Sequence, residues 1–262
     1  MQILKKSLVT LALAGVTFAS HAGTVTVQFD NSIFNPNPTW YDVVNIKYPA
    51  LGTNATVTAN GIAAGRFQGE VRNFSGVSAD SFVNSQSDLF MYCYDVYEHI
   101  NGGRTVTFNV PNTPWSGVEA RTLDFLGAVN SVMSVSGSYD SYAWLNPDNA
   151  ARSAAIQIGI WESLYDASGW NVGAGSFMAS GLELATTVYL DQFFGAIKSD
   201  RSNSLNASYT MLLTAGNAQD MITGNRPRPP QPGTQVPEPG SLALIGLALV
   251  GLAATRRARK AC

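Results

Sequence analysis

Short stretches of alternating apolar and polar residues run through the first half of the chain. The alternation in 24–29, 66–74 and 104–110 is typical of strands with one buried face. Clusters of Asn, Pro and Gly at 35–38 and 101–103 separate these stretches and indicate turns. The first half of the chain is therefore predicted to consist mainly of β-strands.

Apolar positions take up helical spacing in the second half. One stripe consists of Val118, Phe125, Val129, Val132 and Met133, and another of Leu184, Val188, Phe194 and Ile197. The residues at 146–149 supply a turn and a candidate N-cap for a further helix around Gln157, and 209–213 returns to a strand pattern. This order predicts an α+β fold, a β-sandwich or barrel-like set of strands with an inserted helical subdomain. The apolar stripes are expected in its core.

The N-terminus has the three parts of a secretory signal peptide. Lys5 and Lys6 give a charged start, and 8–18 is mostly apolar. Ser20 and Ala22 place small residues at the −3 and −1 positions of a cleavage site. An N-terminal anchor is the alternative, but the apolar run is shorter than the roughly 20 residues that one membrane span needs. We therefore expect signal peptidase to cleave after Ala22.

The C-terminus combines a Pro-rich stretch, a short hydrophobic segment and a basic tail. The Pro-rich stretch, 225–240, is expected to act as a semi-rigid spacer. Small and aliphatic residues fill 242–254, which is short for a permanent span but is expected to form a short hydrophobic helix in the membrane. The basic residues that follow are Arg256, Arg257, Arg259 and Lys260. Positive charge there would hold the tail on the cytoplasmic side.

The order of spacer, Pro-Glu-Pro, apolar run and basic tail resembles the PEP-CTERM sorting signal of exported bacterial proteins. The motif itself consists of Val236, Pro237, Glu238 and Pro239. The resemblance implies that an exosortase, a membrane transpeptidase, cuts near this motif and passes the ectodomain to the cell surface or matrix. A plain tail anchor is the alternative.

The part of the chain that would be exported contains few charged residues, and most of them are acidic. Charged residues make up 13% of the whole chain, about half of the usual share. Residues 23–236 contain ten basic and seventeen acidic side chains, a net charge of −7. This balance favours solubility and argues against a nucleic-acid partner. The predicted units are the signal peptide 1–22, the ectodomain 23–224, the linker 225–240 and the hydrophobic segment with its tail, 241–262.

Cys93 is the only cysteine left once both ends are removed, so the exported domain cannot form an intramolecular disulfide. It follows Tyr92 inside an aromatic, strand-prone run at 89–97. Gln157 and Trp161 are four residues apart on the predicted helix and therefore share one face. The plain interpretation is that Cys93 is a small buried hydrophobe and Gln157 an ordinary buried amide.

An aromatic-Cys strand together with an apolar-Gln-x-Ala-apolar-Trp helix resembles the bacterial thioester-domain adhesins. Here Gly159 replaces the Ala, and a mid-helix Gly costs about 1 kcal/mol, so a shorter or bent helix is expected. The resemblance implies that the Cys93 sulfur attacks the Gln157 carboxamide, releases ammonia and closes an internal thioester. An amine on a partner would then open this bond and form an amide. The aromatic side chains expected to shield the thioester from water are Tyr92, Tyr94 and Trp161.

Other chemistry has little support in the sequence. On one strand His99, the only histidine left after export, would lie about 20 Å from Cys93, although a turn could bring the two together. An exposed loop histidine is the simpler interpretation. The sequence contains no nucleophile elbow, P-loop, EF-hand loop or dinucleotide fingerprint. One His and one Cys cannot form a zinc set. We expect no cofactor, no metal, no catalytic residues and no turnover enzyme.

Three functions remain open, of which a secreted hydrolase that would depend on His99 has the least support. The first is covalent attachment, through a Cys93–Gln157 thioester, to an amine-bearing surface protein or other amine partner. The second is a non-reactive structural role in an extracellular polysaccharide matrix or biofilm, with Cys93 inert and buried. In each case signal peptidase and an exosortase are expected partners, and the C-terminal segment lies in the membrane before processing.

Overall fold

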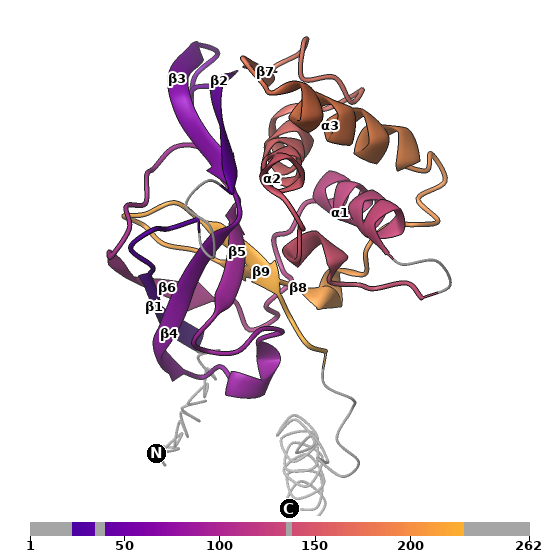
Figure 1. The fold of residues 1–262 in the computed structure, drawn as a ribbon. Coiled ribbons are helices and arrows are strands. Elements are labelled where there is room, and N and C mark those ends of the chain that lie inside the picture. The colour runs from indigo at the N-terminus through magenta and orange to yellow at the C-terminus, as the bar shows by residue number, and fades with distance from the viewer. Residues whose placement is uncertain (1–22, 35–39, 135–137, 228–262) are drawn as a thin grey trace, which may run out of the picture. The chain divides into compact units, whose positions relative to one another are not determined.

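A computed structural model describes residues 23–34, 40–134 and 138–227. The strands are β1 (Gly23–Phe29), β2 (Tyr41–Pro49), β3 (Thr56–Gly65), β4 (Phe67–Ser75), β5 (Leu89–Cys93), β6 (Thr105–Val110), β7 (Met178–Ser180), β8 (Thr210–Leu213) and β9 (Met221–Gly224). The helices are α1 (Ala120–Met133), α2 (Ala150–Tyr165) and α3 (Leu184–Ala196). The three helices lie together on one side of the large sheet (Figure 1).

Six antiparallel strands form the large sheet, in the order β6-β1-β4-β5-β9-β8. Its two edge strands meet at Asn109 and Thr214. The Asn109 N–H donates to the Thr214 carbonyl at 2.8 Å, and the Thr214 N–H donates back at 3.0 Å. The sheet is therefore nearly closed and barrel-like, and the inward side chains of β1, such as Val25 and Val27, are fully buried.

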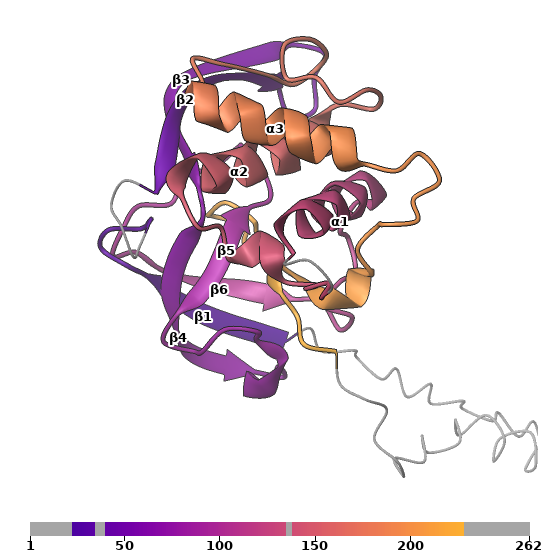
Figure 2. The same ribbon diagram turned by 45° about the vertical axis from the view of Figure 1, so that its right-hand side comes forward.

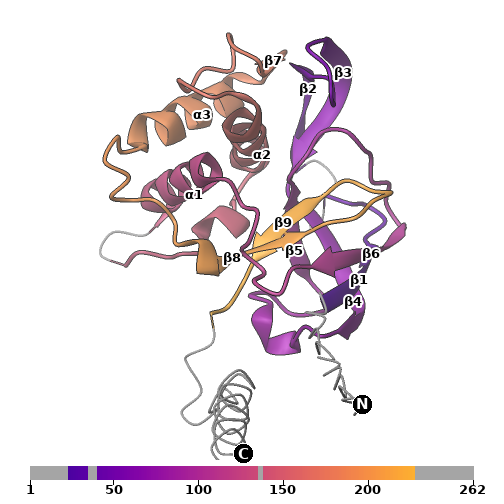
Figure 3. The ribbon, with the colours of Figure 1, turned by 180° about the vertical axis from the view of Figure 1, so that it is seen from behind.

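A smaller sheet has the order β3-β2-β7. The β2–β3 hairpin stands beside α2 and α3, as the opposite views in Figures 1 and 3 show. Alternate residues of β2 are buried, among them Val44 and Ile46, and α2 packs against both strands of the hairpin. Asp42 is also buried on this strand, and its carboxylate is satisfied there because it accepts the Glu183 N–H at 2.9 Å.

The helices are inserted between β6 and β8 and pack on one another (Figure 2). Asn149 caps α2, since its side-chain oxygen accepts the Arg152 N–H at 2.9 Å. The helix then runs without interruption to Tyr165, so the expected shortening at Gly159 is wrong, and the bend stays a prediction. The Phe125 ring of α1 packs directly on Gly159, and a Cβ at that position would collide with it. The glycine thus allows α1 and α2 to approach closely.

The strand-rich fold with an inserted helical part is confirmed. The strands predicted at 24–29, 66–74, 104–110 and 209–213 are present as β1, β4, β6 and β8, with shifts of one residue. The strand predicted over 89–97 ends at Cys93, because the Asp95 carboxylate accepts the Tyr97 N–H at 3.2 Å and turns the chain. The strands β2, β3, β7 and β9 were not predicted.

Within 23–34, 40–134 and 138–227, no helix is long and apolar enough to cross a membrane. The predicted signal peptide, the motif at 236–239 and the hydrophobic segment at 241–262 lie outside the described residues. The boundaries of the predicted units stay predictions.

Candidate functional site around Cys93

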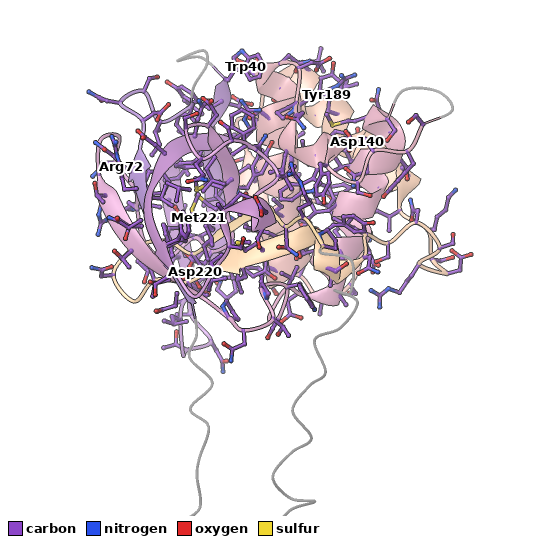
Figure 4. The ribbon with its side chains drawn as sticks, turned by 90° about the horizontal axis from the view of Figure 1, so that it is seen from below. Trp40, Arg72, Asp140, Tyr189, Asp220 and Met221 are labelled. Carbon is purple, nitrogen blue, oxygen red and sulfur yellow. The ribbon has the colours of Figure 1, made fainter. Side chains whose placement is uncertain are left out.

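Cys93 is the last residue of β5 and has a strand on only one side. Towards β9 it is paired with Met221, and the next residue, Tyr94, donates its N–H to the Asp220 carbonyl at 2.7 Å. Because alternate residues of an antiparallel strand bond to opposite sides, the peptide groups of Cys93 point towards β4. The pairing with β4 stops at Met91, so that strand does not reach them. Asp220 and Met221 mark the start of β9 in Figure 4.

The side chain of Gln157 fills the place of the missing strand. Its Oε1 accepts the Cys93 N–H at 2.9 Å, and its Nε2 donates to the Cys93 carbonyl at 2.8 Å. Gln157 is fully buried on α2. Both peptide groups of Cys93 are therefore satisfied by one carboxamide, as buried backbone groups must be.

A second carboxamide, that of Gln219, contacts the thiol itself. The Cys93 Sγ donates to Gln219 Oε1 at 2.9 Å. The Gln219 Nε2 donates to the Asp95 carbonyl at 2.6 Å, which fixes the amide with its oxygen towards the sulfur. Trp161 Nε1 donates to the same carbonyl at 3.1 Å. Gln219 lies in the turn between β8 and β9 and is almost completely buried.

The structure thus brings Cys93 and Gln157 together across 64 residues of sequence, and adds Gln219. Gln219 was not predicted from the sequence. Its neighbours, Ala218 and Asp220, form no motif, and it follows the short strand β8 in a turn where a Gln is usually exposed. Only its burial, with 6% of the residue exposed, distinguishes it, and burial cannot be seen in the sequence.

Burial dominates the electrostatics of the site. It raises the pKa of the Cys93 thiol well above its ordinary value, and the nearby Asp95 carboxylate raises it further. Burial also raises the pKa of Asp95 to about 6. The thiol is therefore protonated at neutral pH and can donate to Gln219 Oε1. The thiolate, which is the nucleophilic form, is rare.

A cavity of about 280 Å³ reaches the thiol, and both Gln219 and Trp161 line it together with Cys93. His99 also lines this cavity, because the chain turns after Cys93, and its side chain is exposed. The sequence had allowed for such a turn.

The three aromatic residues predicted to shield the site occupy different places. Trp161 lines the cavity, whereas Tyr92 and Tyr94 neighbour Cys93 in the chain and point to the other face of the strand. There Tyr92 packs on Trp144, with ring centroids 5.9 Å apart, and the Tyr94 hydroxyl accepts the Glu119 N–H at 2.7 Å. Their positions give no support to a shielding role for the two tyrosines.

The site offers nothing for a metal ion. Among the residues that the structure describes, no three His, Cys, Asp or Glu side chains come together as a ligand set. The chemistry available at this site is that of a thiol between two carboxamides.

A family model for the PEP-CTERM protein-sorting motif matches residues 235–260. The chain carries a PEP-CTERM sorting motif. The match includes the four predicted motif residues, Val236, Pro237, Glu238 and Pro239. It supports an exosortase substrate, since the motif implies processing by an exosortase and an exported protein that passes through the membrane.

No curated protein and no solved structure matches this chain. The resemblance to the thioester-domain adhesins therefore rests on the short motifs at Cys93 and Gln157 alone.

Proposed function

We propose that this PEP-CTERM protein is an exported domain that closes an internal thioester at Cys93 and attaches covalently to an amine-bearing partner at the cell surface or in the matrix. The observation that carries the proposal is the contact of 2.9 Å between Cys93 Sγ and the Gln219 carboxamide. This hydrogen bond from Sγ to Oε1 holds the buried thiol beside the side-chain carbonyl that the ring closure would use, which supports the proposal.

The reaction balances within the chain. The Cys93 sulfur adds to the side-chain carbonyl carbon, its proton passes to the amide nitrogen, and the C–N bond breaks to release ammonia. The thioester carbonyl is then open to a primary amine, whose attack forms an amide and returns the thiol. Because each chain reacts once, this is covalent capture and not turnover.

The two carboxamides differ in what they offer to this reaction. Both polar atoms of Gln157 are engaged by the backbone of Cys93, whereas Gln219 faces the sulfur. We therefore assign Gln219 as the acyl donor and Gln157 as the clamp that holds Cys93. The Cys93–Gln157 bond predicted from the sequence is the alternative, and peptide mapping separates the two.

The test is the intact mass of the exported chain before and after methylamine. We expect a mass one ammonia below that of the processed sequence, followed by the gain of one methylamine. Cys93→Ala and Gln219→Ala should both restore the full mass and abolish uptake, while Gln192→Ala, on the exposed face of α3, should change neither. Full sequence mass and no uptake in the folded wild-type chain would overturn the proposal. A cross-linked peptide containing Gln157 would overturn the assignment of Gln219.

A second candidate function is the inert one, a structural component of an extracellular polysaccharide matrix. The observation in its favour is the burial of Cys93, of which 2% is exposed, together with the raised pKa of its thiol. It predicts a free thiol in the native chain that a maleimide labels fully only after unfolding. A native chain that still lacks a titratable thiol after unfolding in denaturant at low pH would contradict it.

A further inference from the structure

Apolar atoms make up somewhat more than half of the walls of the cavity that reaches Cys93. The walls come from the segment after β1, from the β2–β3 hairpin, from β4 and from the segment after β5. The main apolar side chains are Ile33, Phe34, Ile46, Ile62, Phe67 and Ile100. Four of these, Ile33, Phe34, Ile62 and Ile100, are only half-buried, so apolar area remains uncovered beside the thiol.

Charge is missing from the same walls. Of the described residues that line the cavity, none is Asp, Glu, Lys or Arg, and His99 and Asn101 are the polar side chains on the segment after β5. A cation that enters such a space loses water and meets no carboxylate in the lining itself, which is costly. A molecule with several hydroxyl groups would lose hydrogen bonds to water in the same way.

We propose that this cavity is the route by which the amine reaches the thioester, and that it selects primary amines carried on an apolar arm over aminosugars and polyamines. This inference rests on the proposed thioester function and names its substrate class. The amine arrives as the neutral base, its nitrogen attacks the thioester carbonyl carbon, the C–S bond breaks, and the amine proton passes to the Cys93 sulfur. The arm replaces water along the cavity wall.

The test compares second-order rate constants for incorporation into the full-length chain, at equal concentrations of free base. The panel is methylamine, propylamine, butylamine, hexylamine, spermidine and glucosamine, and incorporation is read by intact mass. Each buried methylene should raise the rate constant by up to about fourfold until the arm outgrows the cavity. Glucosamine and spermidine should react more slowly than butylamine. A maximum at butylamine points to a lysine side chain as the natural source, and a rise that continues to hexylamine points to a longer alkylamine; both support the proposal.

Equal rates for methylamine and butylamine, or faster reaction of glucosamine, would overturn the selectivity while the loss of ammonia still showed the thioester. A chain with full sequence mass and no incorporation of any amine would instead overturn the proposed function, and this inference with it.

A variant of the wall provides a second test. Ile62→Ser should lower the ratio of the butylamine to the methylamine rate constant towards one, because Ile62 lines the cavity. Val43→Ser, at an exposed position of β2 outside the cavity lining, should leave the ratio at the wild-type value. An unchanged ratio in Ile62→Ser, in a chain that still loses ammonia, would contradict the proposal.

Discussion

Two glutamines meet at Cys93 from two different regions of the molecule. Gln157 comes from α2, a helix packed on both other helices and on the β2–β3 hairpin. Gln219 comes from the short turn between β8 and β9. The carboxamide of Gln157 therefore holds the backbone of Cys93, and the carboxamide of Gln219 contacts its sulfur.

The difference shows that residue type alone does not assign a role at this site. Gln157 replaces two hydrogen bonds that a neighbouring strand would have made, so its loss leaves peptide groups of Cys93 without partners. Gln219 accepts from a thiol, which is a weak donor, so its contact with Cys93 contributes little to stability. One glutamine should matter mainly for folding and the other mainly for chemistry.

The largest expected effect is therefore on stability, in Gln157→Leu. Removal of both hydrogen bonds leaves a buried N–H and a buried carbonyl unpaired at Cys93, and each costs about 1–3 kcal/mol. We expect the free energy of unfolding to fall by roughly 2–5 kcal/mol, measured by urea denaturation of a Cys93→Ala background in which no thioester can form. Gln219→Leu in the same background should cost about 1 kcal/mol. Equal losses of unfolding free energy in the two variants would show that both glutamines contribute alike to stability.

A second prediction concerns the backbone that carries each glutamine. Gly159→Ala, two residues after Gln157, would drive a Cβ into the Phe125 ring and should cost about 1–3 kcal/mol. Gly216→Ala, in the β8–β9 turn, meets open space and is the matched control, which should change stability by less than about 0.5 kcal/mol. Thermal unfolding measures both.

The double variant Gly159→Ala with Phe125→Leu sharpens this test, because the smaller side chain makes room. If overpacking is the cause, the double variant should be more stable than the sum of the two single changes predicts. Strict additivity would place the defect elsewhere.

The smallest expected effect is the pH dependence that α2 contributes. Burial raises the pKa of Glu162 to about 7 from its ordinary value of 4.5. Between these values the folded state keeps a proton that the unfolded state has lost, so stability falls as pH rises. Between pH 5 and 6 this group should lower the free energy of unfolding by at most about 1.4 kcal/mol.

Glu162→Gln should flatten that part of the profile, which urea denaturation at pH 5, 6 and 7 measures. Burial raises the pKa of Asp95, two residues after β5, to about 6, so Asp95 should still make stability fall with pH below pH 6 in this variant. A profile that Glu162→Gln leaves unchanged would show that Glu162 is ionised in the folded state.

The helix that carries Gln157 could be predicted from the sequence better than the turn that carries Gln219. A helical face can be recognised from spacing, so Gln157 and Trp161 could be placed together, and the turn before α2 predicted its cap, which Asn149 provides. The aromatic run around Cys93 indicated a strand, although not that it ends there.

The turn side depends on tertiary contacts that leave no local pattern. The strands β8 and β9 have four residues each, and Gln219 is buried beside the turn after β5, where its Nε2 donates to the Asp95 carbonyl. The strand β3 was not predictable either, since Thr56–Gly65 consists largely of small residues without a regular buried face and is held by its pairing with β2. In both places, residues that are distant in the sequence determine whether a side chain is buried.

The position of Gln219 near the end of the fold has a mechanical consequence. A partner joined to its side chain would be connected to the C-terminal end of the processed domain through the short stretch 219–227, which contains β9 and little else. Tension between partner and cell envelope would then load β9 first, against its pairing with β5 and β8, and the chain before Gln219 would lie outside the covalent path. A partner joined at Gln157 would instead pull through α3 and β8, and the domain would lengthen as it unravelled under load.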